Sequence, residues 1–292
     1  MGRPLFDTDP YFREAIFHAE RIVRRANGPS IIDRIFSDSD AWLMDLRVSH
    51  PAIFAFQWAV AQSLRRQGLA PAASLGASLG EYVALTVSGA VDFAAMLTFI
   101  VRQSQTIVEL VPPGGMVTVL ATSAYYAQQR HLFGGCTLAA VNFDGHIVVA
   151  GPRDALQRCC LALAQEGIAI YPLNVPFGFH SRDVEVARAP FFAAAASLSL
   201  GEVTMPVISC VDAVGVVGRL DADHLWRIVE QPIHFLKAIR YAEQALQRPT
   251  YVDCSPSGTL ANFLRYILGP EARPRIVAAY SPGRTELATA AP

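Results

Sequence analysis

Apolar residues recur at helical spacing through much of the first hundred residues of the chain. The pattern predicts amphipathic helices over residues 10–27, 51–68 and 93–111, with a further short helix over 31–36. The run Pro112-Pro113-Gly114-Gly115 then interrupts the pattern, because proline and glycine both disfavour a continuing helix. We therefore expect a structural boundary at this run.

The spacing of apolar residues changes after the boundary. The order that it predicts is strand, helix, strand, strand, helix, strand, over residues 116–121, 123–132, 136–141, 146–150, 153–166 and 168–173. That order is typical of the ferredoxin-like fold. It predicts a small α+β domain over residues 116–183.

Helices and short apolar strands alternate again beyond residue 184. Strands are expected at 207–211, 250–254 and 275–279, and helices at 222–229, 233–246 and 258–268. The whole pattern predicts an α/β fold. Residues 1–115 and 184–292 would form a hydrolase-like core with a parallel sheet, into which the ferredoxin-like domain is inserted.

Composition narrows the class of protein. The chain has 292 residues, of which 52% are hydrophobic and 17% charged, and this suits a globular protein with a buried core. The formal net charge of −1 gives no reason to expect nucleic acid or an anionic membrane as partner. The five cysteines form no C-x-x-C pair, so no metal site is expected. Without a secretory signal or a membrane-spanning apolar run, we expect a cytoplasmic protein.

The segment Gly76-Ala77-Ser78-Leu79-Gly80 follows a short apolar run and precedes a helical one. In that context G-x-S-x-G is typical of a nucleophile elbow, a sharp turn that exposes the serine at a helix N-terminus. The Leu79 N–H would then donate to an oxyanion formed there. The alternative interpretation is a Gly-rich turn with a capping serine.

A serine nucleophile needs a base within hydrogen-bond reach. His180 is the candidate, because it lies at a Gly-containing turn that leaves the predicted small domain and carries the chain back to the core. The alternative is a histidine with a purely structural role.

Six segments together carry a resemblance to one family. They are SHPAIF from Ser49, GASLGE from Gly76, GGM from Gly114, AAVN from Ala139, FGFHS from Phe177 and YVDCSP from Tyr251. With these segments the chain is similar to the malonyl-CoA:acyl-carrier-protein transacylase family, which includes the acyltransferases of fatty acid and polyketide synthases. The resemblance implies ping-pong acyl transfer, with Ser78 as nucleophile and His180 as base. It also implies that a main-chain carbonyl, placed on Ile228 by ungapped matching, orients the histidine.

The chain departs from the family at the positions that hold the substrate. Ala77 stands where the family usually has histidine, and Gln103 stands where members that take malonyl groups have arginine. Glutamine cannot neutralise a buried carboxylate, and leaving one unpaired costs about 2–5 kcal/mol. Malonyl should therefore be a poor substrate. The alternative is a one-residue shift that brings Arg102 into the site.

The resemblance also places His50, Asn142 and Phe179 near the substrate. His50 stands where the family usually has glutamine, and the alternative is a helix-entry histidine without a chemical role. The family's first strand and G-Q-G-S-Q loop, which supplies half of the oxyanion hole, have no counterpart here. We expect the native chain to start further upstream; the alternative is a weakened enzyme that lacks one oxyanion donor, a loss that costs about 10²–10³ in rate.

The retained Ser–His pair and the lost carboxylate clamp resemble the acyl hydrolases found beside polyketide synthases with free-standing acyltransferases. The hypothesis is hydrolysis of short, uncharged acyl groups from acyl-carrier-protein thioesters. The alternatives are transfer of malonyl or another acyl group from CoA to a carrier protein, and a non-catalytic homologue that only docks carrier proteins. No metal or bound cofactor is expected, since the phosphopantetheine arm of acyl carrier protein or of CoA delivers the acyl group.

Overall fold

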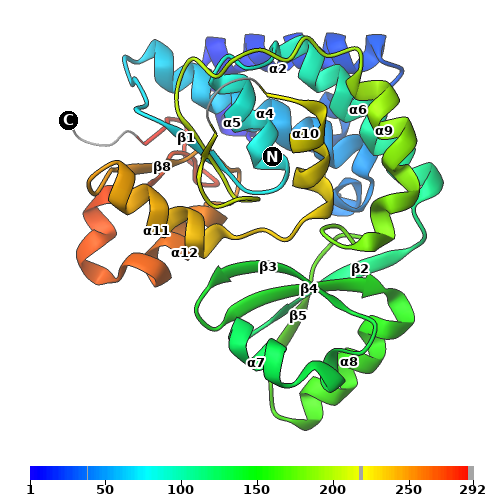
Figure 1. Cartoon of the computed structure of the whole chain (residues 1–292). Helices are drawn as coiled ribbons and strands as arrows, with labels where there is room; N and C mark the ends of the chain where they lie inside the picture. Colours follow the sequence, from blue (N-terminus) through cyan, green and yellow to red (C-terminus); the bar gives the residue numbers. More distant parts are fainter. Residues whose placement is uncertain (38, 217–219, 289–292) are drawn as a thin grey trace.

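The computed structural model describes residues 1–37, 39–216 and 220–288. Figure 1 shows a larger, helix-rich part above a smaller part that is built around one sheet. The α-helices are α1 (Arg3–Thr8), α2 (Pro10–Arg25), α3 (Ile31–Ile35), α4 (Leu46–Arg66), α5 (Leu79–Val87), α6 (Phe93–Leu110), α7 (Ser123–Gln128), α8 (Arg153–Gln165), α9 (Arg188–Ala195), α10 (Ala222–Glu230), α11 (Phe235–Ala245) and α12 (Thr259–Leu268). The 3₁₀ helices are η1 (Asp40–Met44), η2 (Arg130–Phe133), η3 (Arg182–Ala187) and η4 (Pro270–Arg275). The strands are β1 (Ser74–Gly76), β2 (Gly114–Val119), β3 (Thr137–Phe143), β4 (His146–Pro152), β5 (Ile170–Pro172), β6 (Val207–Ser209), β7 (Gly215–Val216), β8 (Tyr251–Asp253) and β9 (Ile276–Ala278).

The strands of the larger part pair mainly in parallel. β1 pairs with β6, with Leu75 opposite Ile208, and β8 pairs with β9. Parallel neighbours need long crossover connections, and helices supply them. Val207 packs into the main core with residues of α2, α4 and α6, whereas its neighbour Ile208 packs into a second core with residues of α11 and α12. Both faces of β6 are therefore covered by helices, and the predicted α/β fold class is confirmed.

The smaller sheet is antiparallel, in the order β3-β4-β2-β5. Val117 and Val149 pack with residues of α7 and α8 on one face, whereas Met116 and Val148 join the main core on the other. Alternate residues of one strand thus serve two cores, as the period of two requires. The order of elements is the predicted ferredoxin-like one.

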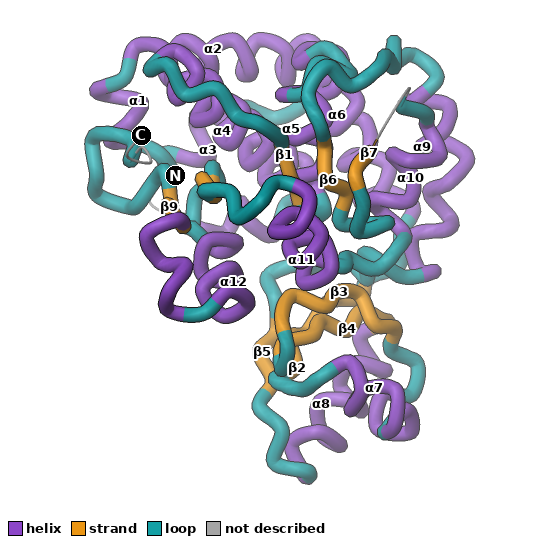
Figure 2. Tube along the Cα trace, turned by 60° about the vertical axis from the view of Figure 1, so that its left-hand side comes forward, coloured by secondary structure: helices purple, strands orange, loops and turns teal. Residues whose placement is uncertain are grey.

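Backbone hydrogen bonds attach this sheet to the larger part. Val141 N–H donates to Ile233 O (2.8 Å), and Ile233 N–H donates to Ala139 O (2.9 Å). Figure 2 shows α11, which follows Ile233, directly above β3. The residues that enter α11 are therefore fixed to an edge strand of the small sheet.

Helix α4 begins at Leu46, earlier than the predicted start at residue 51. Asp45 caps it by accepting a hydrogen bond from Arg47 N–H, and Pro51 lies inside the helix. Proline is more common in the first turn of a helix, so the sequence pattern placed the start too late. Helix α1 was not predicted, because it is short and is held by burial of Leu5 in the main core.

Candidate active site

The turn between β1 and α5 holds Ser78 in an unusual backbone conformation. Its φ of 53° and ψ of −125° are rare for a residue other than glycine. A Cβ atom on Gly76 would lie 2.0 Å from Gly80 O, so only glycine fits there. The Ser78 side chain makes no capping hydrogen bond to α5, and the capping interpretation is therefore wrong.

His180 lies opposite this serine. Ser78 Oγ is 2.9 Å from His180 Nε2, and His180 Nδ1 is 2.9 Å from Gln231 O. A carbonyl oxygen only accepts, so Nδ1 carries the proton and Nε2 presents its lone pair to the serine hydroxyl. The His180 backbone N–H also donates to Val229 O (2.9 Å). The end of α10 thus holds both the ring and the backbone of His180.

The carbonyl that orients His180 belongs to Gln231 and not to Ile228, so the prediction from ungapped matching is wrong by three residues. Ile228 lies inside α10, whereas Gln231 follows its last residue in an extended conformation (ψ 152°). A carbonyl inside a helix points along the helix axis, and a carbonyl beyond its end is free to turn toward a side chain.

Burial decides the protonation state of His180, which is 2% exposed. Burial lowers the pKa of His180 to about 4, opposed in part by the hydrogen bond to Gln231. The imidazole is therefore neutral at neutral pH, as a general base must be.

Leu79 N–H is the first amide of α5, a position for which a helix provides no acceptor of its own. None of the described residues accepts a hydrogen bond from it. The Leu79 N–H lies next to Ser78 and can donate to an oxygen of a group that is bound to Ser78 Oγ. Ala77 is half-buried and packs against the second core, so it brings no polar group to the turn.

The sequence of the chain is similar to those of known proteins. A family model described as acyl transferase domain matches residues 1–290. The chain belongs to this family. The predicted membership is confirmed.

Proteins of polyketide biosynthesis are among those to which the chain is similar. Polyketide biosynthesis protein ThaF of Burkholderia thailandensis is 36% identical over 282 residues, which are 95% of this chain but only 24% of that protein. Polyketide biosynthesis acyltransferase homolog BaeD of Bacillus velezensis is 32% identical over 98% of this chain and 89% of its own. Among solved structures, a loading acyltransferase from the avermectin modular polyketide synthase superposes with a TM-score of 0.84 at 27% identity, covering 92% of this chain and 86% of that one.

Gln103 is buried in the structure, whereas its neighbour Arg102 is exposed. Gln103 is 4% exposed, and its Nε2 donates to Tyr82 Oη (3.3 Å). Tyr82 lies in α5, about one helical turn after Ser78. Arg102 is exposed, and none of the described residues forms a hydrogen bond or ion pair with its side chain. Arg102 was the alternative substrate-binding residue, and its exposure contradicts that alternative, because neighbouring residues on a helix point about 100° apart.

His50 and Phe179 lie together beside the Ser78–His180 pair. Their ring centroids are 5.5 Å apart, and those of Phe179 and His180 are 6.4 Å apart. His50 Nδ1 is buried without a partner among the described residues, and burial lowers the pKa of His50 to about 4. Phe179 therefore packs near two imidazoles, and both are neutral at neutral pH.

Asn142 is also buried, but its side chain is 3.2 Å from His146 Nδ1. No contact described for Asn142 reaches Ser78 or His180. The structure therefore gives no contact between this predicted site residue and the Ser78–His180 pair.

Sequence analysis missed a buried pair that involves Glu81, three residues after Ser78. Glu81 is fully buried, accepts a hydrogen bond from Cys210 N–H (3.1 Å) and lies 2.9 Å from His224 Nε2. Arg227 contacts His224 Nδ1 (3.3 Å) and forms an ion pair with Asp212. A carboxylate in the first turn of an otherwise apolar helix was the available sequence signal, since such a charge is rarely buried without partners.

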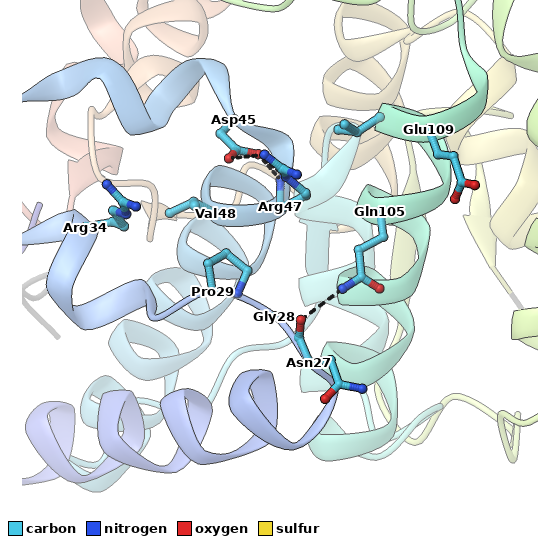
Figure 3. A pocket seen from close by; sticks show the side chains of 10 residues that line it. Asn27, Gly28, Pro29, Arg34, Asp45, Arg47, Val48, Gln105 and Glu109 are labelled. Atoms are coloured by element: carbon cyan, nitrogen blue, oxygen red, sulfur yellow. Dashed lines mark hydrogen bonds and ion pairs between the residues drawn. The ribbon is translucent and has the colours of Figure 1, made fainter.

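A surface groove lies away from the Ser78–His180 pair. It is a groove of about 690 Å³, lined by Asn27, Gly28, Pro29, Arg34, Asp45, Arg47, Val48, Gln105, Val108 and Glu109. Figure 3 shows Asp45 paired with Arg47 and Gln105 pointing toward the backbone at Asn27 and Gly28. None of its lining residues belongs to the Ser78–His180 pair.

In residues 1–37, 39–216 and 220–288, no group of three or more His, Cys, Asp or Glu side chains is placed to hold a metal ion. No helix in this part of the chain has the length and apolar character needed to cross a membrane.

Proposed function

We propose that the protein is a Ser–His acyl hydrolase that removes short, uncharged acyl groups from acyl-carrier-protein thioesters in polyketide biosynthesis. The observation that carries the proposal is the combination of a 2.9 Å Ser78–His180 contact with a buried glutamine, Gln103, in place of a cation. The similarity to the polyketide biosynthesis proteins ThaF and BaeD supports a setting in polyketide biosynthesis.

The first half-reaction acylates Ser78. Its Oγ attacks the thioester carbonyl carbon while His180 Nε2 takes the hydroxyl proton, and the Leu79 N–H donates to the oxyanion. The C–S bond then breaks, and the phosphopantetheine thiolate leaves with the proton from His180. Gln231 O accepts from Nδ1–H throughout and keeps the imidazole in the tautomer that this step needs.

The second half-reaction releases the acid. His180 Nε2 takes a proton from water, the resulting hydroxide attacks the acyl-Ser78 carbonyl, and the ester C–O bond breaks as the proton returns to Ser78 Oγ. One thioester and one water give one carboxylic acid and one thiol. His180 is neutral at neutral pH because burial lowers its pKa to about 4, so it can act as base in both halves.

Substrate choice follows from charge. A carboxylate beside Gln103 would lie in a buried site without a cation, and the cost of about 4 kcal/mol would disfavour malonyl by roughly a thousandfold. Arg102 is exposed and offers no compensation there.

Intact-mass spectrometry tests the proposal. The protein is mixed in turn with an acetylated carrier protein, acetyl-CoA and malonyl-CoA, and Ser78→Ala is the control. Loss of acetyl from the carrier to water, without a stable malonyl adduct, is the expected result. A stable malonyl adduct that passes its load to a carrier protein would overturn the hydrolase and favour a transferase.

The transferase is the second candidate, and the family comparison favours it because the matching model and BaeD are both described as acyltransferases. A non-catalytic docking homologue has less support. A protein that only docked carrier proteins would not need a strained serine within hydrogen-bond distance of a buried, neutral histidine.

A further inference from the structure

Two side-chain hydrogen bonds join α5, which begins directly after the nucleophile, to α10, whose end holds the base. Glu81 and Tyr82 lie near the start of α5, and they contact consecutive residues of α10. Glu81 Oε1 is 2.9 Å from His224 Nε2, and Tyr82 Oη donates to Leu225 O (3.2 Å). All four residues are buried, so bulk water does not compete for these hydrogen bonds.

The neighbours of His224 define its tautomer. Arg227 Nη2 lies 3.3 Å from His224 Nδ1, and because a guanidinium only donates, Nδ1 must accept. The ring proton is therefore on Nε2, which donates to Glu81. The second oxygen of the Glu81 carboxylate accepts from Cys210 N–H (3.1 Å). Both imidazole nitrogens and both carboxylate oxygens thus have a described partner, and the pair has a single arrangement of hydrogen bonds.

These contacts close a series that begins and ends at Ser78. Glu81 N–H donates to Ser78 O (2.8 Å), and the Glu81 side chain contacts His224 in the first turn of α10. At the other end of α10, Gln231 O lies 2.9 Å from His180 Nδ1, and His180 Nε2 lies 2.9 Å from Ser78 Oγ. A shift of α10 against α5 would therefore change the distance between the nucleophile and the base.

We propose that Glu81, Tyr82 and His224 are positioning residues, which fix α10 against α5 and so hold His180 Nε2 at hydrogen-bond distance from Ser78 Oγ. Apolar side chains would also pack the two helices together, and they would not require a buried carboxylate, which is costly unless it is hydrogen-bonded. Hydrogen bonds restrict distance and angle, so they define the relative position of the helices more narrowly than apolar packing does. The inference rests on the Ser78–His180 pair of the proposed function, but not on whether water or a carrier protein accepts the acyl group.

The rate at which a fluorophosphonate modifies Ser78 tests the proposal without an acyl substrate. Ser78 Oγ attacks phosphorus, the P–F bond breaks, fluoride leaves, and His180 Nε2 takes the hydroxyl proton. Intact mass follows the reaction. His224→Met should slow it by about 100-fold, because a misplacement of about 1 Å can cost about 10²-fold in rate. His224→Gln should stay within about tenfold of the parent rate, because its amide offers a donor and an acceptor, as the neutral imidazole does.

Tyr82→Phe is a second and milder variant, since it keeps the buried ring and removes only the hydroxyl that donates to Leu225 O. It should slow the reaction by about tenfold, again through misplacement. Tyr126→Phe is its matched control, because Tyr126 is also buried and its hydroxyl donates to Cys136 O in the small domain. His131→Met is the matched control for His224→Met, because His131 is exposed in η2. Both controls should react at the parent rate.

Circular dichroism and Tm establish which variants are folded at the assay temperature. A folded His224→Met or Tyr82→Phe protein that reacts at the parent rate would overturn the proposal. Equally slow reaction of His224→Met and His224→Gln would also overturn it, because the loss would then not depend on the hydrogen bonds. A parent protein whose Ser78 is not modified would refute the Ser78–His180 pair and this inference with it. Transfer in place of hydrolysis would change only the proposed function.

Discussion

Arg102 and Gln103 are neighbours in α6, yet one is exposed and the other is buried with its amide 3.3 Å from Tyr82 Oη. The charged side chain is thus exposed, and the neutral one is buried. We expect this arrangement to disfavour acyl groups that carry a carboxylate, because a buried carboxylate requires a paired cation.

Gln103→Arg should increase the amount of stable malonyl adduct on Ser78, since a guanidinium can pair with the malonyl carboxylate. We expect an increase of at least tenfold in adduct, measured by intact mass after mixing with malonyl-CoA. Gln103→Met is the uncharged control and should show no increase. Arg102→Ala, made without any change at Gln103, should not alter malonyl loading. A loss of malonyl loading in this variant would count against the assignment of Gln103, and not Arg102, to the acyl-binding site.

Activity should persist to unusually low pH. Because burial lowers the pKa of His180 to about 4, the base form is present above that pH and is lost as the pH falls through about 4. The acid limb of kcat/KM for an acetyl thioester should lie near pH 4, and not near the 6.5 of an ordinary histidine. Circular dichroism at each pH separates this titration from unfolding. An acid limb at 6.5 with the fold intact would refute the assignment of His180.

Ser78 and His180 should act as a unit. Ser78→Ala and His180→Ala should each lower kcat by roughly 10⁴–10⁶, and the double variant should be no slower than the worse single variant. Hydrolysis of an acetylated carrier protein measures all three. Gln57→Ala is a suitable control, because Gln57 lies on the neighbouring helix α4 without a described hydrogen bond to either residue. If the loss of kcat in the double variant equalled the product of the two single losses, the two residues would not act in the same step.

Glu81→Gln should destabilise the protein, since one amide oxygen cannot serve both Cys210 N–H and His224 Nε2 as the carboxylate does. Removing one partner from a buried pair costs about 3–5 kcal/mol. Urea denaturation should show this loss in the free energy of unfolding. Glu185→Gln is the matched control, because Glu185 pairs with Arg188 at an exposed site, and it should change stability by less than about 1 kcal/mol. Equal effects of the two substitutions would contradict the importance of the buried pair.

The two glycines of the elbow should respond differently to alanine. A Cβ on Gly76 would lie 2.0 Å from Gly80 O, whereas a Cβ on Gly80 would meet only Gln57 Oε1 at 3.6 Å. Gly76→Ala should therefore abolish activity or soluble expression. Gly80→Ala should leave Tm unchanged or raise it slightly, since alanine favours a helix interior. Soluble, active Gly76→Ala protein would mean that the turn differs from the one described.

The amino-acid sequence by itself determined the kinds of elements and their order. The change from helical spacing to alternation after Gly115 predicted the ferredoxin-like part, because local burial patterns depend only on the period of each element. The tight turn at Gly76 and Ser78 was equally local, and the G-x-S-x-G pattern was enough to place it.

The tertiary structure alone decided which distant groups meet. Gln231 is 51 residues from the histidine that it orients, and His224 is 143 residues from Glu81. Such partners depend on where helix ends and loops are packed, and one residue of shift turns a helical side chain by about 100°. That is why ungapped counting chose Ile228, and why it left Arg102 and Gln103 as alternatives.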